Sequence, residues 1–321
     1  MAYGTPNSLD EVEPYYTDIR GGRKPSPENL RELITRYQKV GGKTPLLEIT
    51  REQARALEKE LGENFRVYVG MKHWHPYIAQ AIEEIVRDGS TRVIALPLAP
   101  HYSRFSIEGY FQRVRDAIQK LNAPLDVTYV ESWNDHPLFL RAVAEKTEEA
   151  RQKFGASGWD DIQVIFSAHS LPEKILQSND PYPQELRETC EGVASLIGLK
   201  QWRFAYQSAG RTGEKWLGPD ILETLAVIAS EAKQSPNRDA EIASSRSALL
   251  AMTEKNVRRV LIAPIGFVAD HLEILYDIDV ECAARAHELG IELKRTGSLN
   301  ADPTFIYALG AIVSKEIAKR P

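Results

Sequence analysis

The sequence predicts an α/β protein with two doubly wound domains, each built on a parallel sheet covered by helices on both faces. Short apolar runs alternate with helical patterns along the 321 residues. The runs are continuously apolar, which is typical of parallel strands that are buried on both faces. The length also suits two domains of ordinary size.

Seven segments have the composition of strands. They lie at 65–70, 92–99, 125–131, 162–168, 202–208, 258–267 and 291–297. The polar stretch ESWNDHP at 131–137 is the expected crossover, so we place an N-terminal domain at 1–133 and a C-terminal domain at 134–321. Active sites of such folds lie at the carboxyl ends of the strands.

Capping signals locate two of the expected helices. Ser26 followed by Pro27 opens one helix, since proline is favoured at the first helical position. Thr50 is the expected N-cap of the next helix, with Gln53 at the capping-box position and Gly62 as its stop. Further helical patterns fall near 76–88, 106–121, 137–154, 183–197, 219–229, 271–289 and 303–319. We expect the last helix to pack on the first domain.

Two segments do not suit a compact doubly wound fold. The stretch 229–253 is rich in Ala and Ser, and a connection of a few residues would normally suffice there, so we interpret it as an insertion with a short helix around 241–252. The motif AYGTP at 2–6 has the character of a loop that follows a first strand, yet no strand precedes it. Either the first strand is missing or the true start of the chain lies upstream; if the chain starts at Met1, the first half is expected to be of low stability.

Composition excludes several classes of protein. Hydrophobic residues make up 43%, charged residues 26%, and the net charge is −5, with no basic tract of the kind that binds nucleic acid. The sequence has neither a transmembrane run nor a secretory signal, so we expect a cytoplasmic protein. Its two cysteines, Cys190 and Cys282, are too few for a four-cysteine iron–sulfur cluster and are interpreted as buried small hydrophobes.

Two features carry chemistry. VIFSAHSLP at 164–172 puts His169 at the end of a strand, where imidazole could take a proton or bind a metal; alone, a structural histidine is the better interpretation. In DHLEILYDIDVE at 270–281, Glu273, Asp277 and Glu281 recur every four residues and would form one stripe on a helix. Like charges at that spacing disfavour a helix, so water or a cation is expected to compensate the repulsion.

Three motifs in this order resemble ferrochelatases, the enzymes that insert iron(II) into a porphyrin: FSAHSLP, YQSAGRTGEKWLGPD at 206–220 and PIGFVADHLEILYDIDVE at 264–281. The resemblance covers nearly the whole chain. AYGTP, YYTDIRGGRKP, RYQKVGGKTPL and LAPHYSRFSIEGY look like the Gram-positive branch, which metallates coproporphyrin III. The resemblance implies two Rossmann-like, chelatase-like domains, of which the first binds porphyrin and the second carries the metal site.

The resemblance also implies roles for the acidic stripe and the strand-end histidine. His169 and Glu273 become the catalytic pair at the metal; whether His169 is base, ligand or both stays open. Asp277 and Glu281 extend the pair outward as a conduit for hydrated Fe²⁺, whose outer end would also accept Mg²⁺; the alternative is a solvated face. His271 is expected to orient Glu273. Asp270 and Asp279 are expected to cap or solvate.

Further positions match the family's substrate-binding residues. Tyr3 would face the porphyrin centre, and Trp216 would pack on the macrocycle; a core position is the alternative for each. The positions implied for propionate binding are Arg20, Arg36, Tyr37, Thr44 and Tyr110. Arg suits that task because its planar fork matches a carboxylate. Gly21 stands where some relatives have a second Arg, and Thr44 where related chains have Ser. Lys72 and His73 are expected to support the slot from behind.

The leading hypothesis is a monomeric, cytoplasmic coproporphyrin III ferrochelatase whose partners are the porphyrin and ferrous iron, with no nucleic acid and no membrane insertion. Within the same class, the alternatives are protoporphyrin IX ferrochelatase or a cobalt- or nickel-inserting relative. From other classes, a non-catalytic heme- or porphyrin-binding protein and an inactive truncated product are kept open.

Overall fold

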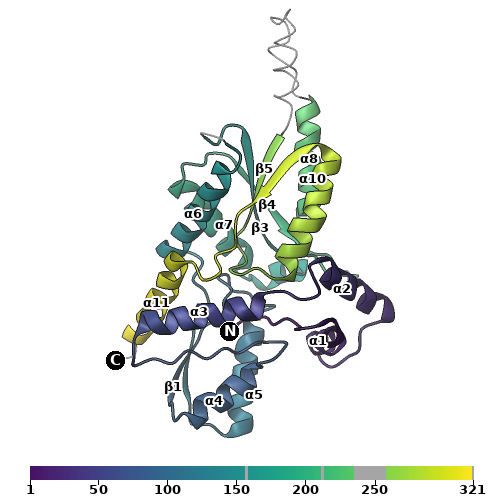
Figure 1. The fold of residues 1–321 in the computed structure, drawn as a ribbon. Helices are drawn as coiled ribbons and strands as arrows, with labels where there is room; N and C mark the ends of the chain where they lie inside the picture. The colour runs from purple at the N-terminus through teal and green to yellow at the C-terminus, as the bar shows by residue number, and fades with distance from the viewer. Residues whose placement is uncertain (156–157, 211–212, 235–257, 320–321) are drawn as a thin grey trace, which may run out of the picture.

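A computed structural model describes residues 1–155, 158–210, 213–234 and 258–319, and it shows an α/β fold with two parallel sheets (Figure 1). The larger sheet has the order β4-β3-β5-β6, and each neighbouring pair is parallel. The smaller sheet pairs β1 with β2, also in parallel. The strands are β1 (Arg92–Ala95), β2 (Asp126–Tyr129), β3 (Ile162–His169), β4 (Trp202–Gln207), β5 (Arg258–Pro264) and β6 (Ile291–Arg295). The predicted α/β class with parallel sheets is confirmed.

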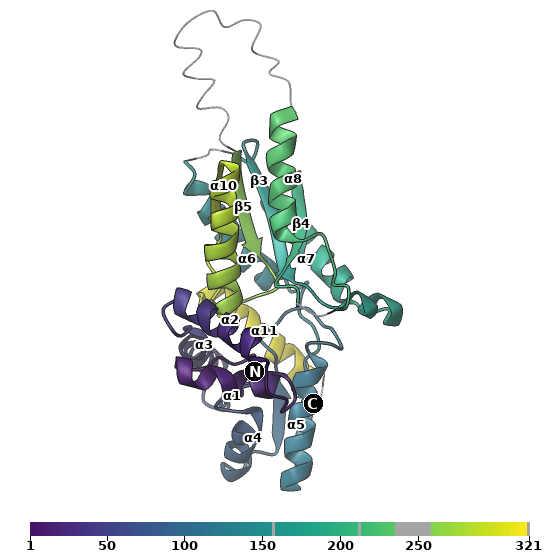
Figure 2. The same cartoon turned by 90° about the vertical axis from the view of Figure 1, so that its right-hand side faces the viewer.

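Helices cover both faces of the larger sheet (Figures 1 and 2). Val164 and Phe166 of β3 pack in the cluster with α6 and α7, whereas Ile165 between them packs in the cluster with α8 and α10, so the strand is buried on both faces. The helices are η1 (Leu9–Glu11), α1 (Val12–Ile19), α2 (Pro27–Lys39), α3 (Leu46–Leu61), α4 (Ile78–Arg87), α5 (Glu108–Leu121), α6 (Pro137–Gln152), η2 (Glu173–Ser178), α7 (Tyr182–Leu196), α8 (Ile221–Gln234), η3 (Glu273–Cys282), α10 (Ala283–Leu289) and α11 (Pro303–Ala318).

The capping predictions are partly confirmed. Ser26 caps α2, with its hydroxyl accepting a hydrogen bond from the Asn29 amide at 3.2 Å and Pro27 in the first turn. Gly62 ends α3 with a positive φ of 86°. The prediction for Thr50 is wrong: α3 begins four residues earlier, and the Thr50 hydroxyl donates to the Leu46 carbonyl at 2.7 Å inside the helix. Leu46 is buried, so packing extends the helix upstream.

Other expectations are corrected at the edges of the small sheet and near the proposed insertion. The segment 65–70 forms no strand, and α1 was not predicted. Helix α8 continues to Gln234, so the first residues of the proposed insertion at 229–253 are helical. The rest of that insertion, with its expected short helix, lies outside the described residues.

The first residues of the chain form hydrogen bonds at the edge of the small sheet, although they are not part of one of its strands. The Met1 amino group donates to the Leu96 carbonyl at 2.8 Å, and the Leu98 amide donates to the Met1 carbonyl at 2.8 Å. On the other side, the Ala2 amide donates to the Gly70 carbonyl at 3.2 Å. Within the described ranges β1 has only β2 as a strand neighbour.

The last helix joins the two halves of the molecule. Helix α11 packs against both α3 and α6, and its residues Phe305, Leu309 and Ile312 share one apolar core with Leu57 of α3. We call the part around β1 and β2 the small lobe and the part around β3–β6 the large lobe. The domain division at 133/134 stays a prediction. In the part of the chain that the structure describes, none of the helices is both long and apolar enough to cross a membrane.

Candidate active site

The carboxyl ends of β3 and β5 bring His169 and Glu273 together. His169 is the last residue of β3, and Glu273 opens the helix η3 that follows β5. The two strands are neighbours in the sheet, so their ends reach the same edge. The His169 Nε2 atom lies 3.7 Å from Glu273 Oε1, and the side chains are 32% and 30% exposed. The pair is therefore accessible to a ligand that lies over the sheet edge.

The helix that carries the acidic stripe is a π-helix. It spans Glu273–Cys282, and ordinary α-helix resumes only at Ala283. The predicted α-helix at 271–289 is therefore wrong in type over its first half. A π-helix pairs residues i and i+5, so each turn is wider than in an α-helix and residues four apart still lie on the same side. Such helices are rare and are frequently found at functional sites.

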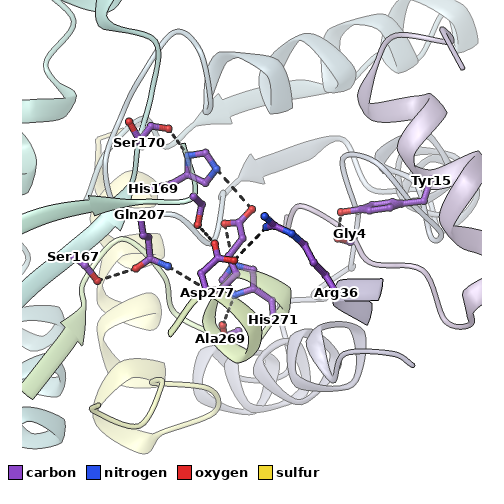
Figure 3. A network of polar contacts seen from close by, with 12 residues as sticks. Gly4, Tyr15, Arg36, Ser167, His169, Ser170, Gln207, Ala269, His271 and Asp277 are labelled. Atoms are coloured by element: carbon purple, nitrogen blue, oxygen red, sulfur yellow. Dashed lines mark hydrogen bonds and ion pairs between the residues drawn. The ribbon is translucent and has the colours of Figure 1, made fainter. Parts of the chain in front are cut away.

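Repulsion along the stripe is compensated by an arginine from the small lobe. Arg36 of α2 lies 3.3 Å from Asp277 Oδ1, and Figure 3 shows its side chain reaching across to that carboxylate. Asp277 is only 6% exposed and also accepts a hydrogen bond from the Ser208 hydroxyl. Arg36 further contacts Glu32 at 3.2 Å and stacks on Tyr276 at 4.9 Å.

Burial and neighbouring charges shift the pKa values of Asp277 and Glu273 in opposite directions. Burial raises the pKa of Asp277 to about 6, and the charges of Glu273 and Glu281 add to this while Arg36 opposes it. Burial also acts to raise the pKa of Glu273, but His169, His271 and Arg36 together lower it to about 2. Glu273 is thus held as a carboxylate, whereas Asp277 takes up a proton far more readily.

His271 lies where the sequence predicted an orienting residue. Its Nδ1 atom is 2.9 Å from the Ala269 carbonyl, which can only accept, so Nδ1 carries the proton. Its Nε2 atom faces Glu273 Oε2 at 3.4 Å. Burial acts to lower the pKa of His271, yet the hydrogen bond and charge of Glu273 raise it overall. His271 thus lies in position to orient the Glu273 side chain.

Residues that the sequence did not point to complete this edge. The Gln207 side chain donates to the Glu273 carbonyl at 3.2 Å and accepts from the Ser167 hydroxyl at 2.8 Å; both side chains are fully buried. Ser208 holds Asp277 from a backbone with φ of 61°, a strained conformation for a non-glycine residue. Polar residues at the carboxyl ends of apolar strands were the available signal.

Two aspartates near the stripe, Asp270 and Asp279, form ion pairs with Arg295. Arg295 lies 3.2 Å from Asp270 and 2.6 Å from Asp279. Asp270 also accepts from Ser298 at 2.8 Å and from Asn300 at 3.0 Å. Asp279 is exposed, as expected, and pairs with Arg295 at the surface, whereas Asp270 is held by β6 and the loop after it, which anchors the base of η3.

The small lobe presents an aromatic and basic group opposite this pair. The exposed ring of Tyr3 lies 4.6 Å from that of His73, and Lys72 Nζ lies 5.0 Å from the centre of the Tyr110 ring. Burial and the nearby Arg113 lower the pKa of Lys72 to about 8. The sequence placed Lys72 and His73 near the slot, and the structure brings both beside Tyr3.

Asp18 was missed by the sequence reasoning because α1 was not predicted. It accepts from His73 at 2.8 Å and from Arg113 at 2.9 Å, and so fixes the imidazole beside Tyr3. Burial lowers the pKa of His73 to about 4, although Asp18 opposes this shift. His73 is therefore a neutral ring at physiological pH.

The residues at the positions implied for propionate binding differ in how far burial and existing contacts leave them able to bind a ligand. Tyr37 and Thr44 are buried, and both bond to the Thr5 hydroxyl, at 3.3 Å and 2.8 Å. Tyr110 is also buried, and Arg36 is engaged with Asp277. Arg20 has a buried Nε atom without a hydrogen-bond partner in the described part of the molecule, so this donor is unused.

The charge of Glu273 in the large lobe acts on the pKa of three small-lobe tyrosines, Tyr3, Tyr37 and Tyr110. Burial is the main cause that raises the pKa of Tyr37 to about 12, and the charge of Glu273 adds to it. The same two causes raise the pKa of Tyr3 and of Tyr110. The two lobes thus face one another across a common site.

Trp216 lies on the large-lobe side, with its ring 6.3 Å from that of His169. Its backbone pairs with Pro172, so the loop after β3 and the loop before α8 support each other. Gly210 contacts the Trp216 ring, where an added Cβ would lie 2.2 Å from the indole. Trp216 is half-buried, and so it forms part of the wall beside His169.

Over the described ranges, no three His, Cys, Asp or Glu side chains converge closely enough to hold a metal ion. Cys190 and Cys282 are both fully buried and unpaired, as predicted. The potential metal donors at this edge are an imidazole and a carboxylate, His169 and Glu273, each about a third exposed.

Comparison with known proteins agrees with this geometry. The chain matches the family model described as Ferrochelatase over residues 1–235 and 243–317. It is 45% identical over 318 residues to a ferrochelatase of Herpetosiphon aurantiacus, which covers 98% of this chain and 96% of the relative. It is 41% identical to a coproporphyrin III ferrochelatase of Halalkalibacterium halodurans (100% and 96% covered) and 38% identical to that of Bacillus subtilis (99% and 97% covered).

Among solved structures, the fold is similar to that of SirB from Bacillus subtilis with Fe³⁺. The TM-score is 0.55 at 11% identity, covering 84% of this chain and 90% of SirB. At this identity the likeness shows the fold, and it confirms the predicted chelatase-like arrangement. Taken with the full-length relatives, it leads to one conclusion: the chain belongs to the ferrochelatase family and is a metal chelatase, an enzyme of the lyase class.

Proposed function

We propose that the chain inserts ferrous iron into coproporphyrin III, with His169 and Glu273 as the residues that act at the reacting centre. The observation that carries the proposal is the pairing of these two side chains at the joint carboxyl end of β3 and β5, 3.7 Å apart. Imidazole and carboxylate together suit Fe²⁺, whose preference lies between soft and hard ligands. The choice of coproporphyrin III is supported by the relatives of Halalkalibacterium halodurans and Bacillus subtilis, which are named coproporphyrin III ferrochelatases.

Metal insertion releases two protons from the pyrrole nitrogens as iron enters. The Nδ1 atom of His169 contacts the Ser170 carbonyl and so carries the hydrogen of the neutral ring. This leaves the lone pair on Nε2, which faces the site, as the base for a pyrrole proton. A positioned base contributes about 10²–10⁴-fold to such a step. Glu273 is held as a carboxylate by His271 and Arg36, and so can meet the incoming cation.

The macrocycle would lie between Tyr3 of the small lobe and the His169–Trp216 wall of the large lobe. Arg20, with its unused Nε donor, is the first candidate to bind a propionate. Arg36 can serve in the same way only if it leaves Asp277. Asp277 and Glu281 form the outer acidic site of the proposal, where hydrated Fe²⁺ or Mg²⁺ would be held before transfer. We further propose that the enzyme is a cytoplasmic monomer.

The test is metallation under anaerobic conditions, followed by loss of the free-base porphyrin absorbance. Purified protein is mixed with Fe²⁺ and either coproporphyrin III or protoporphyrin IX. His169→Ala and Glu273→Gln are each expected to lower turnover by about 10²-fold or more. The matched control is Glu288→Gln on α10, an exposed carboxylate paired with Arg285 at 2.9 Å, which should leave turnover unchanged.

The outcomes separate the alternatives. Faster turnover of coproporphyrin III supports the proposal, and turnover of protoporphyrin IX alone rejects the substrate while keeping the site. Full activity of both His169→Ala and Glu273→Gln rejects the site. Porphyrin binding without metallation would favour a binding protein or an inactive product.

A further inference from the structure

A buried aspartate of the large lobe holds a loop of the small lobe. Asp180 directly precedes the first turn of α7 and is only 8% exposed. Its Oδ2 atom accepts hydrogen bonds from the Ser103 hydroxyl and from the Arg104 amide, each at 3.0 Å. Its Oδ1 atom accepts from the Tyr182 amide of α7 at 3.1 Å. Asp180 therefore bonds to both lobes at once.

Capping of α7 alone does not explain the charge of Asp180. An asparagine caps a helix about as well as an aspartate, and its burial is less unfavourable because it carries no charge. Hydrogen bonds to a carboxylate are about twice as strong as those between neutral groups. A carboxylate also accepts with both of its oxygens, whereas an amide accepts at one end and donates at the other. The aspartate can therefore hold the helix and the loop together, which an asparagine cannot.

On the large-lobe side, Asp180 is linked to the end of the strand that carries His169. Tyr182, whose amide bonds to Asp180, donates its hydroxyl hydrogen to the His169 carbonyl at 2.9 Å. The Tyr182 side chain is buried. The start of α7 is thus tied to the residue that the proposed function places at the reacting centre.

On the small-lobe side, Asp180 is linked to the wall around Tyr3. Ser103 is fully buried, and its carbonyl accepts from the Ser106 amide at 3.2 Å in the turn before α5. In the same turn the Ser106 carbonyl accepts from Lys72 Nζ at 3.1 Å. The Lys72 Nζ atom lies 5.9 Å from the centre of the Tyr3 ring. The turn 103–106 therefore sets the position of the Lys72 ammonium group beside Tyr3.

Helix α7 also holds the neighbouring residues of this loop without using Asp180. Glu185 accepts from the Tyr102 amide at 2.6 Å, and the Thr189 hydroxyl lies 2.9 Å from His101 Nε2. These bonds remain when the Asp180 carboxylate is changed, so the lobes stay attached. The change is expected to release the turn 103–106 and to leave the rest of the contact in place.

We propose that Asp180 is a positioning residue for metal insertion, which fixes the spacing between the Lys72 and Tyr3 wall of the small lobe and the His169 wall of the large lobe. This role rests on the proposed function, since the porphyrin would lie between these two walls. Asp180 acts through Tyr182 on one side and through the turn 103–106 on the other. A displacement of about 1 Å at a reacting centre can lower a rate about 10²-fold. A loosened turn therefore slows insertion more than it weakens porphyrin binding.

The test compares the full chain with Asp180→Asn, Ser103→Ala and the double variant. Asparagine has the size of aspartate, but it can serve only one of the two sides, because its NH₂ group then faces a donor on the other. Ser103→Ala removes the hydroxyl that donates to Asp180 and leaves the Ser103 backbone in place.

The matched control is Asp302→Asn at the start of α11. The Asp302 carboxylate accepts from the Thr304 amide of its own helix at 2.9 Å and pairs with Lys146 of α6 at 3.0 Å. This variant thus also removes the charge of a capping aspartate, but at a site that the turn 103–106 does not share.

Turnover and porphyrin affinity are measured separately, with whichever of the two porphyrins the unaltered protein metallates faster. The porphyrin Kd is taken from quenching of tryptophan fluorescence. For Asp180→Asn, kcat should fall about tenfold while Kd changes less than about threefold. The double variant should be slower than Asp180→Asn by no more than about twofold, because the two side chains act through one contact. Asp302→Asn should keep kcat within about twofold of the unaltered protein.

Hydrogen exchange gives a readout that does not depend on turnover. In Asp180→Asn, the amide left without its acceptor, that of Arg104 or of Tyr182, should exchange at least about tenfold faster. The Tyr102 amide, which Glu185 holds, should keep its protection.

An unchanged kcat in Asp180→Asn would overturn the proposed role of Asp180. An equal fall in Asp302→Asn, or loss of protection at Tyr102 as well, would also overturn it, because either result would indicate lower stability rather than a displaced wall. So would effects of Asp180→Asn and Ser103→Ala that multiply in the double variant, since the two residues would then act independently. Lack of turnover in the unaltered protein with both porphyrins would refute the proposed function itself, and this role with it.

Discussion

The ion pair between Arg36 and Asp277 gives the sharpest test of how the two lobes are held together. The perturbation is Arg36→Met, which keeps an unbranched apolar side chain and removes the guanidinium that faces Asp277 and stacks on Tyr276. Breaking a buried ion pair by removing one partner costs about 3–5 kcal/mol of stability when the remaining group stays charged. Asp277 can instead become neutral by binding a proton.

The free-energy cost of protonating Asp277 follows from its pKa, which burial raises to about 6. At pH 7 neutralising a group with this pKa costs about 1.4 kcal/mol, since each pH unit above the pKa adds that amount. With about 1 kcal/mol for the lost cation–π contact, the expected loss of stability is about 2 kcal/mol at pH 7. At pH 5 Asp277 is already protonated, so the loss should fall to about 1 kcal/mol.

The assay is urea unfolding at pH 5 and pH 7 for Arg36→Met, Asp277→Asn and the double variant. The double-mutant cycle should show a coupling of about 1–2 kcal/mol at pH 7 and less at pH 5. The control is Arg141→Met, an exposed arginine 2.9 Å from Glu145, which should cost less than about 0.5 kcal/mol. The reasoning is refuted if the loss for Arg36→Met does not depend on pH, or if the cycle shows no coupling.

Three further predictions concern other parts of the molecule. The Met1 amine binds a proton below about pH 5 when folded but below about pH 8 when unfolded, so stability should rise between these values by up to about 4 kcal/mol; Nα-acetylation should flatten that rise in thermal melts. Thr44→Val removes the 2.8 Å bond to the Thr5 hydroxyl and should lower the unfolding free energy by about 1–2 kcal/mol in urea, with no loss if Thr5 finds another partner. Gly266→Ala would place a Cβ 2.8 Å from Ala168 and displace the end of β3, so kcat should fall by about tenfold while porphyrin binding persists; an unchanged kcat would contradict this.

The large lobe was predictable from its sequence because its central strands β3 and β5 are mostly apolar and are buried between helices on both faces. The absence of a strand at 65–70 could not be predicted, because a strand needs a neighbour to form a hydrogen-bond ladder. The local composition does not show whether such a neighbour is present. Likewise, packing of Leu46 extended α3 beyond the cap expected at Thr50. Tertiary contacts decided both cases.

In the site, the sequence located the two strand ends and therefore His169 and Glu273. The π-helix was not predictable, since residues four apart share a side in both helix types and the pattern is the same. Arg36 was expected to meet a propionate, whereas the structure pairs it with Asp277, 241 positions away in the chain. Asp18 was missed with α1, although it orients the His73 ring.

The position of α11 has a consequence for biosynthesis. Helix α3 is among the first parts of the chain to leave the ribosome, but the apolar face of α3 that carries Leu57 is covered by Phe305, Leu309 and Ile312 of α11, which leave it nearly last. The hydrogen bond that Gln53 of α3 donates to the Asn300 carbonyl at 2.8 Å likewise can form only after residue 300 has been synthesised. The small lobe therefore cannot complete its core while translation continues, and it must either remain open or be protected until the carboxyl-terminal helix arrives.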